Sequence, residues 1–264
     1  MGKHINRVMA AALLAATLSA PIAAAAPAEA AGACSNIAHR AMYGQTEEQV
    51  RGVARNRRWG FTEVDARITA DGRVVAIHDL TVQRISGDRS REPVRDLTMR
   101  QIRRLPYEFG RRVETTGRLI REAGEHGSAI MVTVHSYARY QEAWDGGGLE
   151  ALWNAAQAHG KPARVYFGGG GAARAMRIEY GASTFHRYTA RDDVRQHVEE
   201  HGVDLAALPK AHFDRRLVRG LKRDGIRVAS IQLDRKRAVR QANRVGISLV
   251  QTDRGKRTVR RWCR

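Results

Sequence analysis

Short apolar runs rich in β-branched residues recur along the chain, and segments with helical periodicity separate most of them. The apolar runs predict eight strands, at residues 35–38, 61–68, 129–134, 165–167, 182–185, 203–208, 227–233 and 247–251. The segments between them predict helices at residues 47–58, 98–105, 116–126, 137–144, 149–159, 172–180, 192–201, 213–224 and 236–245. A short run at 74–77 reads as a strand returning across the Asp71-Gly72 turn.

This alternation of strands and helices is typical of an α/β protein with a parallel sheet. Eight strand–helix units in residues 34–264 predict a single (β/α)8 TIM barrel. An open, doubly wound sheet with two added edge strands is the alternative. Because no linker, low-complexity stretch or repeat interrupts the pattern, we expect one domain over residues 34–264.

The first 30 residues follow a different pattern. Lys3 and Arg7 precede a short, alanine-rich apolar run, and Ala28-Glu29-Ala30 offers a small-residue cleavage site. These features predict a secretory signal peptide over residues 1–30, cleaved near Ala30 or within the alanine run from Ala23, and hence a secreted protein. No later stretch approaches the roughly 18 apolar residues of a membrane helix, so we expect no transmembrane segment.

The two cysteines, Cys34 and Cys263, lie at opposite ends of the predicted domain. In an oxidising compartment they predict one disulfide that joins the two ends. Two unpaired thiols are the alternative. A lipid anchor on Cys34 is disfavoured because Ala31-Gly32-Ala33 lacks the usual large aliphatic residue and an anchor would leave Cys263 without a partner.

The formal net charge of +19 predicts attraction to anionic partners, such as phosphates, anionic polymers or lipid surfaces. The arginines are spread along the chain and are not collected in one tail, which is equally typical of a compositional bias. Aromatic residues make up 6% of the chain, too few for a row of base-stacking platforms, and we expect no specific nucleic-acid binding.

One stretch concentrates candidate chemistry. Glu63 and Asp65 are two residues apart in a predicted strand, so both side chains point to one face. His39 and Arg40 follow the first predicted strand, and His78 follows the returning strand. Because barrel enzymes carry their active sites at the carboxyl ends of the strands, we expect these groups to converge at the barrel mouth.

The residue types indicate phosphodiester chemistry. Two close carboxylates suit a hard divalent cation, Ca²⁺ or Mg²⁺, which takes oxygen ligands. Two histidines can divide acid and base roles near neutral pH, and an arginine presents a planar fork to a phosphate. We therefore expect a site for hydrolysis of a small-molecule or lipid-derived phosphodiester.

Four motifs in order resemble the glycerophosphodiester phosphodiesterase family, whose pattern runs H-R-G, E-x-D, T-x-D-G and V-x-x-H-D. The matching residues are His39-Arg40-Ala41, Glu63-Val64-Asp65, Thr69-Ala70-Asp71-Gly72 and Val75 to Asp79; residues 217–228 and 246–253 are similar too. The resemblance implies a TIM barrel that cleaves glycerophosphodiesters to glycerol 3-phosphate and an alcohol. It makes His39 and His78 the acid/base pair, Glu63 and Asp65 metal ligands, and Arg40 a phosphate contact.

The sequence departs from the family on the third barrel strand. Family members place E-x-K there, with the glutamate as a metal ligand, whereas this chain has Thr133 and His135. A site with two carboxylates is expected to hold Ca²⁺ or Mg²⁺ more weakly, unless His135 joins it or contacts the substrate. Two alternatives stay open: a phospholipase similar to sphingomyelinase D, and a weakened barrel that binds anionic polymers or lipid.

Overall fold

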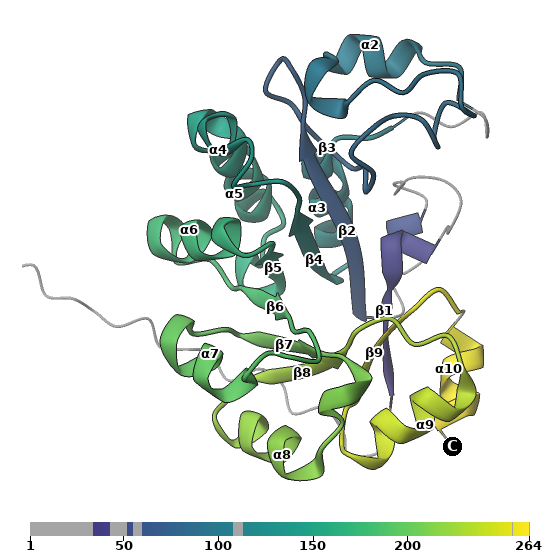
Figure 1. The fold of residues 1–264 in the computed structure, drawn as a ribbon, viewed down its shortest axis with the longest axis vertical. Helices are drawn as coiled ribbons and strands as arrows, with labels where there is room; N and C mark the ends of the chain where they lie inside the picture. The colour runs from purple at the N-terminus through teal and green to yellow at the C-terminus, as the bar shows by residue number, and fades with distance from the viewer. Residues whose placement is uncertain (1–33, 43–51, 55–59, 108–112, 255, 264) are drawn as a thin grey trace, which may run out of the picture.

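The computed structural model describes residues 34–42, 52–54, 60–107, 113–254 and 256–263 (Figure 1). Its strands are β1 (Ser35–Ala38), β2 (Gly60–Ile68), β3 (Val74–Val75), β4 (Ala129–Val134), β5 (Val165–Gly168), β6 (Phe185–Arg187), β7 (Leu205–Leu208), β8 (Arg227–Ser230) and β9 (Leu249–Thr252). Its α-helices are α2 (Met99–Arg104), α3 (Thr116–Glu125), α4 (Gln141–Ala143), α5 (Leu149–Ala158), α6 (Gly171–Tyr180), α7 (Val194–His201), α8 (Arg215–Arg223), α9 (Lys236–Arg244) and α10 (Lys256–Cys263).

The strands form one sheet in the order β5-β4-β2-β1-β9-β8-β7-β6, with parallel pairing between all neighbours. A parallel bridge between Phe167 and Thr184 joins the two ends of this order. The result is a nearly closed barrel of eight parallel strands, with β3 as an antiparallel addition to β2. The predicted (β/α)8 barrel is confirmed, and the open-sheet alternative is wrong.

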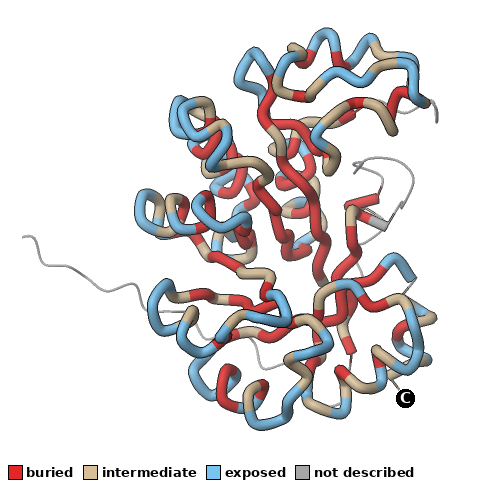
Figure 2. The backbone as a smooth tube through the Cα atoms, viewed as in Figure 1, coloured by how far each residue is buried: buried red, intermediate tan, exposed pale blue. Residues whose placement is uncertain are grey.

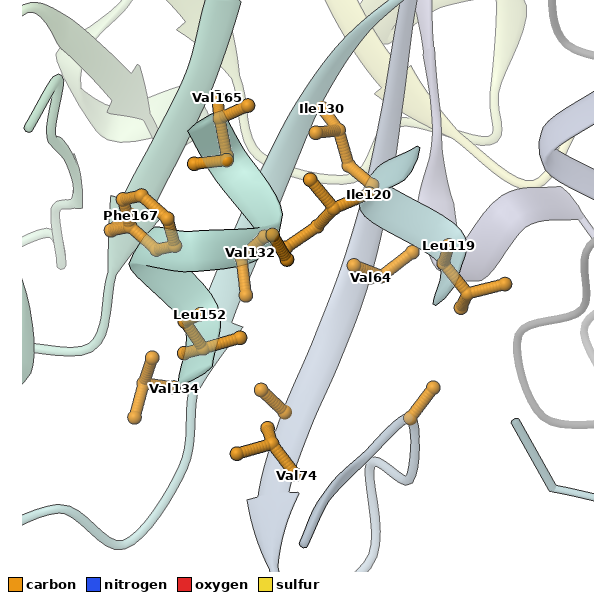
Figure 3. Close-up of a cluster of buried hydrophobic side chains, with 14 of the residues drawn as sticks. Val64, Val74, Leu119, Ile120, Ile130, Val132, Val134, Leu152, Val165 and Phe167 are labelled. Carbon is orange, nitrogen blue, oxygen red and sulfur yellow. The ribbon is translucent and has the colours of Figure 1, made fainter. Parts of the chain in front are cut away.

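Strand alternation sorts side chains between the barrel interior and the helix-facing side. One buried apolar cluster fills the interior, with Ile37, Phe61, Met131, Phe185 and Leu249 among its members. The opposite faces pack against the helices, as Figure 3 shows for Val64 and Val132 near Leu119, Ile120 and Leu152. Figure 2 accordingly shows buried strands inside a ring of helices whose outer faces are exposed.

The structure differs from the prediction at three elements. The predicted helix at 137–144 is helical only at α4, and the chain then continues through a wide turn, Trp144–Gly148, into α5. The strand predicted at 182–185 lies later, at Phe185–Arg187. Helix α10 was not predicted. Most of the helix predicted at 47–58 lies outside the described residues, although 52–54 are helical.

A disulfide joins Cys34, next to β1, to Cys263, at the end of α10, with Cα atoms 6.1 Å apart. The predicted pairing is confirmed. The predicted signal peptide lies outside the described residues. Among those residues, no helix is long and apolar enough to cross a membrane.

Candidate active site

Strand β2 carries two carboxylates at the mouth of the barrel. Phe61, Glu63 and Asp65 alternate with Thr62 and Val64, so the carboxylates continue the inward-facing row that Phe61 begins. Both carboxylates are 1% exposed. Burial raises the pKa of Glu63, and the charge of Asp65 raises it further. Two buried carboxylates this close therefore favour a positive group between or beside them.

His39 follows β1 directly and is buried beside this pair. Its Nδ1 lies 2.8 Å from Oδ1 of Asp253, the residue after β9, which neighbours β1 in the sheet. Gln232 donates a hydrogen bond to the other Asp253 oxygen. A carboxylate on Nδ1 fixes the orientation of the ring. Sequence reasoning missed Asp253; the signal was a carboxylate placed one residue after the last strand.

Arg40 stands against the carboxylates. Its backbone N–H donates to Glu63 (3.1 Å), and its Nε lies 3.5 Å from Oδ2 of Asp65. Arg40 and Ala41 both have positive φ, 47° and 53°, which is uncommon for residues other than glycine. Position 41 is the one where the related family has glycine. The strained turn directs the Arg40 amide to Glu63.

Strand β4 supplies the groups that replace the family's E-x-K. The Thr133 hydroxyl donates to Oε1 of Glu63 (2.9 Å), and Nε2 of His135 lies 2.6 Å from Oδ1 of Asp65. Thr133 and His135 therefore contact the two carboxylates one to one. These contacts run diagonally across the strands: the register aligns Asp65 with Thr133, and each β4-side group contacts the carboxylate two positions before its aligned partner.

His78 reaches the mouth from the loop after β3. Its ring packs edge-on against His135, with centroids 5.2 Å apart, and its Nδ1 lies 2.9 Å from Asp79. Arg67 on β2 donates two hydrogen bonds to the His78 carbonyl, at 2.9 and 2.6 Å, which fixes this loop to the barrel. Burial lowers the pKa of His78, although the hydrogen bond with Asp79 opposes that shift.

Asp79 is itself held in the charged form. Burial alone would raise its pKa, but hydrogen bonds from His78 and Arg84 outweigh that effect and keep the pKa below its usual value. His39 and His78 thus have the same arrangement: each is an imidazole at the mouth whose Nδ1 faces a carboxylate that is itself hydrogen-bonded by another side chain.

The donor groups fit a divalent cation. Ligand atoms of Asp65, His78 and His135 all lie within 4.8 Å of one another, and Glu63 is a second buried carboxylate beside Asp65. Carboxylate oxygens suit Ca²⁺ or Mg²⁺, whereas two imidazoles add affinity for ions such as Zn²⁺. All six residues predicted from the sequence (His39, Arg40, Glu63, Asp65, His78 and His135) therefore meet in one connected cluster.

A (β/α)8 barrel with two carboxylate-anchored histidines beside two buried carboxylates has the arrangement of a hydrolase with acid/base catalysis. The sequence model of the glycerophosphoryl diester phosphodiesterase family matches residues 59–256. The chain belongs to this family and is a phosphoric diester hydrolase of the glycerophosphodiester phosphodiesterase type. Among curated proteins, none matched the sequence.

Solved structures share the fold at low sequence identity. A phosphodiesterase from Oleispira antarctica in complex with the product sn-glycerol-3-phosphate is 15% identical, with a TM-score of 0.69 over 83% of this chain and 92% of that chain. A glycerophosphodiester phosphodiesterase from Thermotoga maritima is 19% identical (TM-score 0.64; 83% and 93% covered). One from Parabacteroides distasonis is 13% identical (TM-score 0.67; 87% and 98% covered).

Proposed function

We propose that this protein hydrolyses glycerophosphodiesters to glycerol 3-phosphate and an alcohol, with His39 and His78 as the acid/base pair. The observation that carries the proposal is that each histidine has its Nδ1 against a carboxylate, Asp253 or Asp79, and we assign Nε2 as the reactive nitrogen. The product complex of the Oleispira antarctica phosphodiesterase supports a substrate of this class.

The proton transfers balance with one water consumed. A water oxygen forms a bond to phosphorus, and the bond from phosphorus to the alcohol oxygen breaks. One imidazole takes the proton of the water, and the other, protonated, gives its proton to the leaving alcohol. Before the next turnover the first ring releases its extra proton to solvent and the second takes one up from solvent, and the carboxylate on each Nδ1 holds the ring in place throughout.

We propose that the reaction depends on a divalent cation. Glu63 and Asp65 would hold it, with His135 as the neighbouring nitrogen donor; the sequence-based choice of ion is Ca²⁺ or Mg²⁺. When bound, the ion supplies charge that offsets the non-bridging phosphate oxygens. Arg40 and His135 are proposed substrate contacts, because both stand against Asp65 at the mouth.

Secretion through cleavage of residues 1–30 is also proposed. It is supported by the Cys34–Cys263 disulfide, because such bonds persist in oxidising compartments.

A second candidate activity is phospholipase chemistry of the sphingomyelinase D type, which Thr133 and His135 favour because they replace the family's E-x-K. The test incubates the mature protein with glycerophosphocholine and, separately, lysophosphatidylcholine, each with Ca²⁺, Mg²⁺ or chelator, and measures released choline and glycerol 3-phosphate. Release from glycerophosphocholine alone supports the first activity. Release from the lysolipid alone would replace it with the second.

The mechanism is tested with His39→Ala and His78→Ala, each expected to lower kcat by at least about 10³-fold with an unchanged circular dichroism spectrum. His126→Ala is the matched control, because His126 is also paired with a carboxylate, Glu122 at 3.0 Å, but lies at the C-terminal cap of α3, outside the cluster. Full activity in either mouth variant would refute the two-histidine mechanism.

A further inference from the structure

The positive charge of the chain is concentrated near its C-terminal end. Residues 215–264 contain 17 of the 46 lysines and arginines but three of the 27 aspartates and glutamates, a net charge of +14. The preceding 214 residues carry a net charge of +5. The arginines that look dispersed in the sequence therefore include one segment with very few compensating carboxylates.

Three neighbouring helices carry most of this charge. Arg215 of α8 donates to the Arg244 carbonyl at the end of α9 (3.0 Å), and Asn243 of α9 donates to the Cys263 carbonyl at the end of α10 (3.0 Å). The three helices follow one another around the barrel in Figure 1. Their apolar residues, such as Val218, pack inward. The helices themselves contain no carboxylates, so all of their charged side chains are cations.

The cations begin at the helix ends nearest the candidate active site. Helices α9 and α10 start just after Asp234 and Asp253, the two carboxylates that Gln232 contacts, and Asp253 holds His39. No acidic residue occupies the first turn of α8, α9 or α10. Cations in a first helical turn oppose the helix dipole and reduce stability. Their placement at the rim therefore favours a role in binding anions.

We propose that this surface, represented by the exposed Arg216, Arg219, Arg237, Arg240, Arg257 and Arg260, binds a linear polymer of phosphodiester-linked polyols. We call it the C-terminal basic face. The proposal rests on the proposed function, because such a polymer repeats the bond that the site cleaves. A row of phosphates in one polymer chain can contact cations on three successive helices at once, whereas one small diester would contact only the site at the barrel mouth.

The chemistry of the face favours this occupant over a bilayer. Among the described residues, the large hydrophobic side chains that are exposed are Leu80 and Ile178, and neither lies in residues 215–263. Peripheral membrane binding normally combines cations with inserted apolar groups. A hydrophilic cationic surface instead suits a hydrated polyanion.

The test compares two triple variants that remove equal charge. Arg216→Gln, Arg237→Gln and Arg257→Gln take one arginine from each helix of the face. Arg100→Gln, Arg103→Gln and Arg104→Gln take three exposed arginines from α2, at the opposite end of the molecule (Figure 1). The probes are poly(glycerol phosphate), vesicles of phosphatidylglycerol and phosphatidylcholine, and glycerophosphocholine, with the kcat for the last reporting an intact active site.

We expect the first triple variant to raise the Kd for poly(glycerol phosphate) at least about tenfold. The slope of log Kd against log salt concentration should fall by about two, because each of the three lost contacts contributes roughly 0.7 to that slope. KM for the polymer should rise with kcat unchanged, and the α2 triple should bind like the wild type. Equal losses in both triples, no loss in the first, or binding to vesicles without binding to the polymer would overturn the proposal.

The two proposals fail in different ways. Polymer binding without hydrolysis of either substrate would refute the proposed function and leave the basic face standing. Hydrolysis of glycerophosphocholine without polymer binding would support the proposed function and refute the role of the C-terminal basic face.

Discussion

At the scale of single residues, the candidate site is defined by how each charged group is held. Asp65 contacts both Arg40 and His135, and Glu63 accepts from Thr133 and from the Arg40 amide. These contacts orient side chains that would otherwise repel one another in a buried setting. The identities of the residues set the chemistry, and their partners set its geometry.

Asp253 is expected to position His39 for catalysis. Asp253→Asn should lower kcat roughly 10³-fold, because the amide cannot stabilise the imidazolium or enforce the same ring tautomer. The split between kcat and KM is the decisive measurement, because a residue that only positions the catalytic ring should lower kcat and leave KM for glycerophosphocholine nearly unchanged. A matching rise in KM together with a lower melting temperature would indicate a structural defect instead.

Thr133 and His135 are expected to set the strength of cation binding. The double change Thr133→Glu with His135→Lys recreates the family's E-x-K and adds a third carboxylate beside Glu63. We expect Mg²⁺ to bind at least about tenfold more tightly by calorimetry and to raise the melting temperature more than in the wild type. Thr133→Val removes the same hydroxyl without adding a ligand, so tighter Mg²⁺ binding in that variant would contradict the explanation.

At the scale of elements, helix α7 contacts strand β6 through packed histidine rings. The ring centroids of His186 and His197 lie 4.0 Å apart in a tilted arrangement, and those of His197 and His201 lie 4.6 Å apart, edge-on. Burial and the neighbouring His197 lower the pKa of His186 to about 4, while Asp192 opposes the shift and His201 adds to it. The contact between these elements therefore depends on neutral imidazoles.

This cluster predicts a loss of stability in acid. Above its ordinary pKa of 6.5, His186 is neutral in both the folded and unfolded states. As the pH falls from 6.5 toward 4, the unfolded chain binds the proton first, so the free energy of unfolding decreases. His186→Phe keeps a ring but cannot titrate, and urea unfolding at several pH values should show a shallower decrease than in the wild type. An equal decrease would assign the effect to other groups.

The cap of α2 is a local test of element stability. Thr98 accepts from the Gln101 amide, and the Gln101 side chain accepts in return from the Thr98 amide, a capping box. Thr98→Ala should lower the free energy of unfolding by about 1 kcal/mol, measured by urea unfolding, without changing kcat. Thr98→Ser preserves the cap, and its free energy of unfolding should stay close to that of the wild type.

At the scale of the whole molecule, one covalent bond ties the first strand of the barrel to its last helix. The disulfide links residues 229 positions apart in sequence. Cys34→Ser with Cys263→Ser should lower the free energy of unfolding by about 2–5 kcal/mol. Chemical unfolding of the wild type with and without reductant provides the comparison, and the double variant should not respond to reductant. Unchanged stability in the variant would mean that packing of α10 suffices.

The sequence predicted most of the barrel because its signals are local. Strand β4 was placed at its observed bounds, because a fully buried run is bordered by polar residues. The prediction from sequence failed where contacts between distant residues decide the structure. The glycines after Trp144 suggested a break, but Trp144 is buried and Gly148 fits closely against it and Ile68, so the chain continues through a wide turn. Strand β6 takes its position from pairing with β7.

The sequence by itself determined the eight strand–helix units, the six candidate site residues and the family, since periodicity and ordered motifs are properties of the chain. Only the tertiary structure decided which groups meet. It set Asp253 against His39, His135 against Asp65, and three basic helices side by side. These contacts join residues up to 214 positions apart, through barrel closure that no local pattern encodes.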